Sequence, residues 1–149
     1  MIIVEENDPR DPQATALLKQ SHALMESLFP PEDNHYLDIE QLRVPEITFF
    51  TAREGDMILG TAAVANKGSY GEVKSMFVSE AARGKGVGAA LMRMIEDTAI
   101  DAKLPILKLE TGNVLHAAHR LYHRHGFTDC GPFADYEVNN TSIFMEKTL

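Results

Sequence analysis

The sequence predicts a single α+β domain built on a mixed, mainly antiparallel twisted sheet of about six to seven strands, flanked by about four helices. Its 149 residues match the length of one domain and are enough to bury a core. Strand-like and helix-like stretches follow one another without the repeated strand–helix units of a doubly wound sheet. No internal repeat or long linker divides residues 1–149, so we expect one domain over the whole chain.

The N-terminal third is expected to contain a strand, a long helix and a loop. Residues 2–5 suit a strand. The helix then begins at a favourable N-cap, Asp11, with Pro12 at its first position. Its apolar residues recur at helical spacing: Ala14, Leu17, Leu18, Leu24, Met25 and Leu28. Two prolines at 30–31 end it, a loop follows, and we expect a further short helix at 37–42.

The middle of the chain is expected to supply the centre of the sheet. Strands at 47–52 and 57–65 form a hairpin around the polar turn 53–56. A second turn at 66–71, which contains two glycines, leads to a half-polar strand at 72–78.

The C-terminal half is expected to alternate helices and strands. A helix covers about residues 86–102 and is followed by a strand at 105–110. A second helix at about 114–125 precedes two closing strands, near 127–132 and 142–147.

A glycine-rich turn, Arg83-Gly-Lys-Gly-Val-Gly88, lies between strand 72–78 and an amphipathic helix. The helical spacing after the turn is carried by Val87, Leu91, Met94, Ile95 and Thr98. Free backbone N–H groups and the positive end of the helix dipole make such a place an anion site, most often for phosphates. Glycine also lets the ligand approach the backbone closely. We therefore predict a phosphorylated cofactor; the alternative is that the glycines only make a tight turn.

Two segments resemble the motifs of one family. Arg83-x-x-Gly86-x-Gly88, placed after such a strand, resembles the coenzyme A motif of the GCN5-related N-acetyltransferase (GNAT) superfamily. Asn113 to Ala118, Leu121-Tyr122 and Gly126-Phe127 resemble its "N…A…LY…GF" signature. The segments 132–136 and 144–147 resemble the tails of uncharacterised bacterial members. The resemblance implies a GNAT-type domain that uses acetyl-CoA as cosubstrate.

The resemblance also implies which residues hold acetyl-CoA. Backbone groups of the strand would hold the pantetheine arm, in a cleft opened by a break in pairing with the next strand: Met76, Phe77 and Val78. The amide of Val78 is a candidate to polarise the thioester. Amides of the turn would hold the pyrophosphate: Arg83, Gly84, Lys85, Gly86, Val87, Gly88 and Ala89. Arg83 or Lys85 would add positive charge. Asn113 would cap the last helix, bind the pantetheine, or do both.

Tyr122 and Glu72 are the candidate catalytic residues. A tyrosine at the motif position of Tyr122 is the general acid in many relatives, and a phenol with a pKa near ~10 keeps its proton at neutral pH. The alternative is an ordinary core aromatic. Histone-type relatives carry a catalytic glutamate at the strand position of Glu72. An ordinary carboxylate is a poor base unless burial or a water relay helps it, and the alternative is a solvated strand-end glutamate.

The acceptor-binding residues are less clearly marked. His35 and Tyr36 lie in the loop that borders the acceptor cleft in the family, and a polar-aromatic pair suits a small substrate. Glu110 enters the acceptor site, or else Thr111–Gly112 forms a bulge; the sequence leaves both open. Asp135–Tyr136 is a further, weaker candidate pair.

Other functions fit the residues less well. Gly84-x-Gly86-x-x-Ala89, with Glu110 after the next strand, loosely matches the fingerprint of a nicotinamide-dependent oxidoreductase. However, the six residues 79–84 separate the strand from the second position of the turn, whereas that fingerprint needs a glycine directly at the end of the strand. A non-catalytic acyl-CoA sensor would keep the glycine turn without needing Tyr122. His116, His119 and His123 share a helix face, but zinc usually needs three or four ligands with a recognised motif, so we expect no metal.

Composition limits the partners and the location. A formal net charge of −8 argues against nucleic-acid binding and is compatible with a cationic substrate. No apolar run approaches the ~20 residues of a membrane span, and residues 1–7 lack the features of a signal peptide, so we expect a cytoplasmic location. The one cysteine, Cys130, fits a reducing compartment and suits a core strand better than an acetyl-carrying nucleophile.

The function that follows is acetyl-CoA-dependent N-acetyl transfer to an amine of a small molecule or peptide, directly within a ternary complex. Homodimers are common in the superfamily, and the sequence leaves the oligomeric state open.

Overall fold

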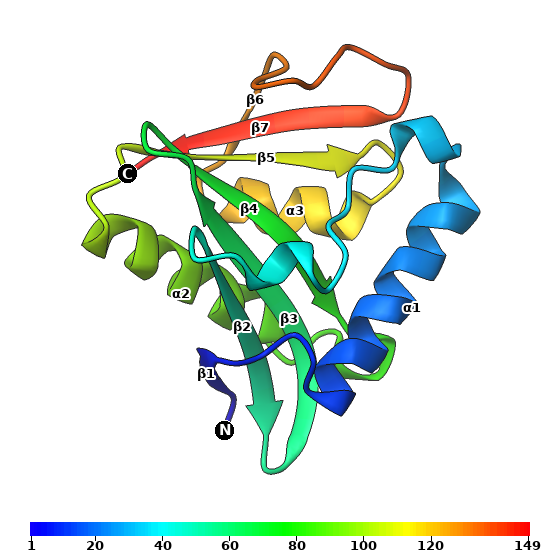
Figure 1. The fold of residues 1–149 in the computed structure, drawn as a ribbon, viewed down its shortest axis with the longest axis vertical. Coiled ribbons are helices and arrows are strands. Elements are labelled where there is room, and N and C mark those ends of the chain that lie inside the picture. Colours follow the sequence, from blue (N-terminus) through cyan, green and yellow to red (C-terminus); the bar gives the residue numbers. More distant parts are fainter.

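The computed structural model describes residues 1–149 and contains one seven-stranded sheet in the order β1-β2-β3-β4-β5-β7-β6 (Figure 1). Its strands are β1 (Ile3–Glu6), β2 (Ile47–Glu54), β3 (Met57–Asn66), β4 (Gly71–Val78), β5 (Ile106–Gly112), β6 (Thr128–Cys130) and β7 (Ser142–Thr148). All neighbouring strands are antiparallel except β4 and β5, which are parallel. The predicted α+β class and mainly antiparallel sheet are confirmed.

Three α-helices accompany the sheet: α1 (Pro12–Leu28), α2 (Val87–Asp101) and α3 (His116–Arg124). Helix α1 begins as predicted, because the Asp11 carboxylate accepts hydrogen bonds from the amides of Gln13 (2.9 Å) and Ala14 (3.2 Å). Three short 3-10 turns, η1 (Pro31–Asp33), η2 (Gln41–Arg43) and η3 (Glu80–Ala82), complete the regular structure. None of the helices is long and apolar enough to cross a membrane.

The prediction of a fourth helix at 37–42 is wrong, because only the single turn η2 forms there. The Gln41 amide donates a hydrogen bond to the Asp38 carboxylate at 2.8 Å, and the Asp38 amide donates one to the Gln41 side-chain oxygen at 2.9 Å. These two bonds start the turn. The turn cannot continue, because Pro45 disfavours the helical conformation of Val44, whose backbone is extended.

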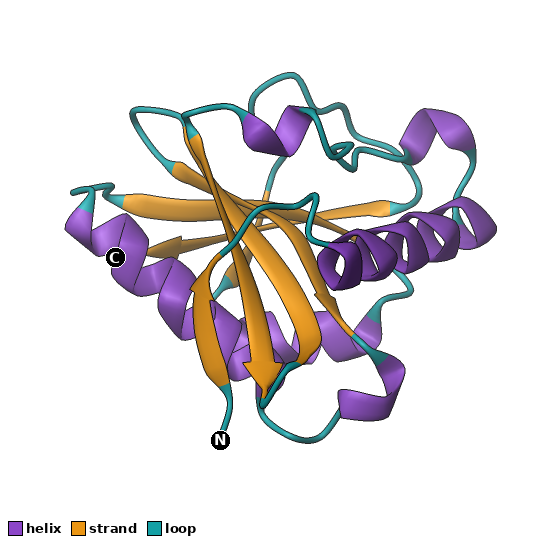
Figure 2. Ribbon diagram, turned by 60° about the horizontal axis from the view of Figure 1, so that its bottom comes forward, coloured by secondary structure: helices purple, strands orange, loops and turns teal.

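The two faces of the sheet are covered by different helices. Consecutive residues of a strand point to opposite faces, so Phe49 packs in a small cluster with Ala14 of α1, while Phe50 packs in the main core with Leu91 of α2. The main core also contains Tyr122 of α3. Figure 2 shows α1 and α2 on opposite sides of the strands.

The sheet opens between β4 and β5. Their pairing is limited to Gly71 with Leu107 and Glu72 with Lys108, after which the strands diverge (Figure 1). On its other edge β4 carries a bulge: Thr61 pairs with Phe77 but Ala63 with Lys74, and Ser75 within the bulge has a φ of 54°. The predicted break in pairing is therefore present, and it leaves the second half of β4 free of a neighbour on the β5 side.

Strand β5 has no bulge at its end. Thr111 pairs with Ile143 and Gly112 with Ser142 in unbroken register with β7. The alternative prediction of a bulge at residues 111–112 is therefore wrong. Glycine at 112 is explained by packing instead. A Cβ there would lie 2.2 Å from Cζ of Phe29, the residue that caps α1.

Candidate functional site

The larger of two adjoining cavities has a volume of about 750 Å³ and lies where β4 ends. Three groups of residues form its walls. These are the last turns of α1 (Leu24, Met25, Leu28), the end of β4 with the glycine turn (Met76, Phe77, Val78, Ala82, Arg83, Gly84, Gly86), and facing parts of α2 and α3 (Val87, Gly88, Ala89, Val114 to Ala118, Leu121, Arg124). Most of these side chains are apolar, so the polar groups here come mainly from backbone amides and two arginines.

The glycine turn has the geometry of an anion cradle. Gly84 and Gly86 have φ values of 82° and 79°, which favour glycine, and a Cβ at either position would meet no atom within 4 Å. The first bond of α2 runs from the Ala90 amide to the Gly86 carbonyl at 3.0 Å, so the amides of residues 87–89 are not used inside the helix. Unused amides at a helix start are chemically suited to a pyrophosphate, and the binding of one by these residues stays a prediction.

Gly88 has a different role from the other two. A Cβ at this position would lie 3.1 Å from Cδ2 of Leu121, so the glycine allows α3 to approach the start of α2. The approach brings α3, which carries Tyr122, to the wall of the cavity.

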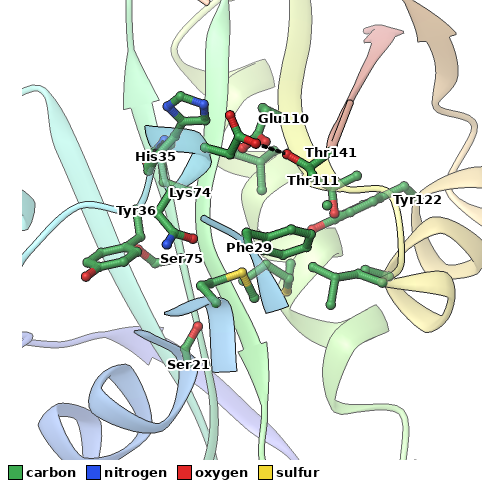
Figure 3. Close-up of a pocket in the computed structure, with 18 residues that line it drawn as sticks. Ser21, Phe29, His35, Tyr36, Lys74, Ser75, Glu110, Thr111, Tyr122 and Thr141 are labelled. Carbon is green, nitrogen blue, oxygen red and sulfur yellow. Dashed lines mark hydrogen bonds between the residues drawn. The ribbon is translucent and has the colours of Figure 1, made fainter. Parts of the chain in front are cut away.

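The smaller cavity, about 120 Å³, adjoins the larger one, since Met25, Met76, Leu115 and Ala118 line both. Its polar lining comes from segments far apart in the sequence (Figure 3): Ser21 of α1, Asp33 to Tyr36 of the following loop, Lys74 and Ser75 of β4, Glu110 and Thr111 of β5, Tyr122 of α3, and Thr141. We call it the acceptor pocket and the larger one the cofactor cavity.

Tyr122 lies at the wall of the acceptor pocket, with its phenol directed into it (Figure 3). The side chain is 6% exposed, and its ring packs against Phe127 with centroids 5.8 Å apart. Burial, and secondarily the nearby Glu110 carboxylate, raise the pKa of the Tyr122 phenol well above its usual value. The phenol therefore keeps its proton at neutral pH, as a proton donor must.

Glu110 lines this smaller pocket, and its contact with the acceptor stays a prediction. Its carboxylate accepts a hydrogen bond from the Ser142 hydroxyl at 2.7 Å. Burial raises the pKa of Glu110, although the Ser142 bond and the charges of His35 and Lys74 act in the opposite direction.

Glu72 does not line either cavity, although it is close to the acceptor pocket. It is 5% exposed and accepts a hydrogen bond from the Tyr136 hydroxyl at 2.5 Å, with the Lys74 ammonium 3.6 Å away. Burial and the bond to Glu72 raise the pKa of the Tyr136 phenol. Glu72 is thus buried rather than a solvated strand end, and its role as base stays a prediction.

Lys74 connects this buried group to the wall of the pocket. Its ammonium donates to the carbonyl of His35 and to the hydroxyl of Tyr136, both at 3.0 Å. The ring of His35 meets that of Tyr136 edge-on, with centroids 5.1 Å apart. Residue 33 is tied to residue 141 by a hydrogen bond of 2.8 Å between the Thr141 hydroxyl and the Asp33 carboxylate. Two loops therefore meet across the pocket.

Tyr36, predicted with His35 to face substrate, lies at the pocket rim and is 38% exposed. It stacks on His22 with centroids 4.0 Å apart and donates to Glu26 at 2.7 Å. These contacts fix the loop onto α1.

Asn113 does not cap α3, so this prediction is wrong. The N-cap is Leu115, and the Asn113 amide donates to the carbonyl of Asn140 at 3.0 Å, joining the loops before α3 and β7. Neither Asn113 nor Lys85 lines the cofactor cavity, and their contact with acetyl-CoA stays a prediction.

Sequence reasoning missed several lining residues, notably Lys74, Ser75, Phe29 and Arg124. Period-two alternation along β4 places Lys74 on the same side as Glu72, which is a usable signal. The bulge at Ser75 leaves no local mark in the sequence. No group of three or more His, Cys, Asp or Glu is placed to hold a metal ion.

The chain is similar in sequence to known proteins. The family model described as "Acetyltransferase (GNAT) family" matches residues 15–127. An IAA acetyltransferase from Azospirillum brasilense is 39% identical over 150 residues, which cover 99% of this chain and 98% of that protein.

Two solved structures have the same fold. One from Klebsiella pneumoniae, described as a candidate acyl-CoA N-acyltransferase, has a TM-score of 0.86 at 29% identity, covering 100% of this chain and 98% of that one. The PaiA N-acetyltransferase of Thermoplasma acidophilum, solved with coenzyme A, has a TM-score of 0.77 at 14% identity, covering 100% and 99% of the two chains. The family model covers most of the chain and the Azospirillum relative nearly all of it, so the chain belongs to the GNAT acetyltransferase family.

Proposed function

We propose that this acetyltransferase moves the acetyl group of acetyl-CoA directly to an amine of a small molecule or peptide, with both substrates bound at once. The observation that carries the proposal is the meeting of the two cavities at Met25, Met76, Leu115 and Ala118. A thioester entering from one side and an amine from the other would come together at this border. Transfer through a protein acyl group is not needed, and Cys130 lines neither cavity.

The cofactor cavity would hold acetyl-CoA in two parts. Amides of residues 83–89 would hold the pyrophosphate, helped by the dipole of α2 and by the positive charges of Arg83 and Arg124 in the cavity wall. Backbone groups of Met76, Phe77 and Val78, which β5 leaves unpaired, would bind the pantetheine arm.

The reaction joins the amine nitrogen to the thioester carbon and breaks the carbon–sulfur bond. The nitrogen gives up a proton, and the departing sulfur takes one. We assign the second proton to Tyr122, whose phenol points into the smaller pocket (Figure 3) and stays protonated. The amide of Val78 is our candidate to polarise the carbonyl.

Two carboxylates are candidates to take the proton of the amine. Glu110 faces the acceptor pocket, and its raised pKa makes it a better base than an ordinary carboxylate. Glu72 would have to act through Tyr136 or a water, because it does not reach the pocket wall. The pH dependence of turnover in Glu110→Gln and Glu72→Gln distinguishes them, since the variant that lacks the base loses the acidic limb of the profile.

The proposal is tested by incubating the protein with acetyl-CoA and a panel of primary amines. Release of the coenzyme A thiol and the mass of the acetylated product are followed together. We expect turnover with at least one amine. Tight acetyl-CoA binding without any turnover would favour the acyl-CoA sensor over the enzyme.

Three further expectations accompany the proposal. A cytoplasmic location and independence from metal ions each have a direct check: fractionation of cells, and activity in the presence of a chelator. Light scattering of the purified protein distinguishes a monomer from the homodimer that the sequence leaves open, which is the third.

A further inference from the structure

We propose that the acceptor pocket recognises a compact zwitterion, such as a free small α-amino acid, with its ammonium group at Glu110 and its carboxylate at Lys74. The inference rests on the proposed function and narrows its substrate class. It is carried by opposite charges in one small pocket, by an unpaired hydroxyl in the same pocket, and by the size of the pocket.

The two charges lie on neighbouring strands that diverge at the pocket. Lys74 belongs to β4 and Glu110 to β5, and the strands pair only at residues 71–72 and 107–108. Both side chains line the cavity, and Figure 3 shows Lys74 on the side of His35, away from Tyr122. A ligand lying between the strands would therefore face an anion on one side and a cation on the other.

Each charge keeps bonding capacity for a ligand. Glu110 accepts one side-chain hydrogen bond, from Ser142 at 2.7 Å, and a carboxylate accepts several more. The Lys74 ammonium has three donors, of which His35 and Tyr136 take two. The third donor makes no hydrogen bond in the structure, although the Glu72 carboxylate lies 3.6 Å from the ammonium, so a ligand carboxylate would share the ammonium with Glu72.

The Glu72 carboxylate partly neutralises the charge of the Lys74 ammonium, and Lys74 still lines the pocket. That carboxylate lies 3.6 Å from the Lys74 ammonium but outside the pocket lining, held there by Tyr136. A second carboxylate of the pocket lining, Asp33, accepts a hydrogen bond from the Thr141 hydroxyl at 2.8 Å. The summed charge of Asp33, Glu72, Lys74 and Glu110 is negative when all are ionised. The pocket therefore holds the ammonium group of the ligand most strongly. Lys74 favours those amines that also carry a carboxylate.

Ser75 supplies an additional donor next to Lys74. Its Oγ is the one buried side-chain polar atom in the structure that has no hydrogen-bond partner, and Ser75 lines the pocket. Buried polar groups are nearly always paired, so a bare hydroxyl in a pocket wall points to a ligand group that pairs with it. A ligand carboxylate has oxygens for both Ser75 and Lys74.

The size of the pocket limits the ligand. Its volume of about 120 Å³ is well below the ~300 Å³ at which pockets for drug-sized ligands begin. The Thr141–Asp33 hydrogen bond of 2.8 Å joins the loops across it. A compact acceptor fits these limits, and a chain extending from the carboxylate end would meet Lys74 and His35.

The test compares glycine, alanine and serine with their amides and with the corresponding amines that lack the carboxylate. We expect the free amino acids to exceed their amides by about ten-fold or more in kcat/KM, the effect of one charge-assisted contact. In Lys74→Met this ratio should fall to near one. Lys108→Met is the matched control, because Lys108 lies on the neighbouring strand over Tyr70 and Phe133, outside both cavities.

Ser75→Ala keeps the test decisive if Lys74→Met folds poorly. It removes an unpaired hydroxyl, so thermal stability should not fall, whereas KM for the amino acid should rise several-fold. Amides or simple amines used as well as the acids in the wild type would overturn the zwitterion while leaving the acetyltransferase intact. Acetyl-CoA binding without acetylation of any amine would overturn both proposals.

Discussion

The two cavities of this protein are built in different ways. The cofactor cavity is formed largely by backbone and apolar side chains, with its anion cradle in one continuous stretch, residues 83–89. The acceptor pocket has a mixed lining, whose polar side chains come from α1, two loops, two strands and α3. A cofactor that all members of a family use can be bound by the same backbone shape in each of them. An acceptor that differs between members must be recognised by side chains that can change without altering the fold. The cofactor is therefore the easier of the two ligands to deduce.

The largest effect is expected from the cofactor side. Gly86→Glu adds a carboxylate to the cradle, so the Kd for acetyl-CoA should rise about 100-fold or more in a calorimetric titration. The control is Gly55→Glu, which places the same side chain at a positive-φ glycine in the β2–β3 turn, also in open space. Equal losses in both variants would mean that backbone strain, not the cradle, is responsible.

The next effect tests the border between the cavities. Tyr122→Phe should lower kcat by about ten-fold or more, because it removes the proton donor, while the Kd for acetyl-CoA stays nearly unchanged. Tyr70→Phe, which alters a tyrosine outside both cavities, should change neither quantity. An unaltered kcat in Tyr122→Phe would remove this residue from the mechanism.

A third change strains the acceptor side alone. Gly112→Ala brings a methyl group against the Phe29 ring, which lines the acceptor pocket, and should destabilise the protein by about 1–3 kcal/mol in urea unfolding. Gly131→Ala, in open space, should be close to neutral. Adding Phe29→Leu to Gly112→Ala should recover part of the loss. If it recovers nothing, the contact with Phe29 is not the reason for the glycine.

The smallest effect is a difference in how stability depends on pH. Burial raises the pKa of Glu110, so the folded state binds the Glu110 proton more tightly than the unfolded state does. The free energy of unfolding therefore falls as the pH rises above the pKa of this carboxyl group in the unfolded chain. Glu110→Gln should therefore be more stable than the wild type near neutral pH, and the difference should vanish in acid. Melting curves from pH 4 to pH 8 provide the measurement. A gap that does not change with pH would argue against this titration.

The elements that local signals mark are the ones the sequence predicts well. Asp11 and Pro12 mark the start of α1, and the prolines after it mark its end. The glycine turn is recognisable because its function depends on a contiguous backbone shape. The helix expected at 37–42 is reduced to one turn because Pro45 lies just beyond it. This is also a local signal, but a prediction from hydrophobic periodicity alone does not take it into account.

The acceptor pocket depends on contacts that no short stretch contains. The Asp33–Thr141 bond joins segments 108 residues apart in the sequence, and the bond from Tyr136 to Glu72 spans 64 residues. Glu110 is predictable as a candidate but not as a pocket residue, because its placement depends on the divergence of β4 and β5. The bulge at Ser75 arises from pairing with β3, which local sequence does not specify.

The most direct test of the account is a matrix of initial rates in which acetyl-CoA and the best amine acceptor are both varied. Direct transfer between the adjoining cavities predicts double-reciprocal lines that intersect, with no acetyl group on the protein after acetyl-CoA alone. Parallel lines, together with an acetylated residue such as Cys130, would contradict it.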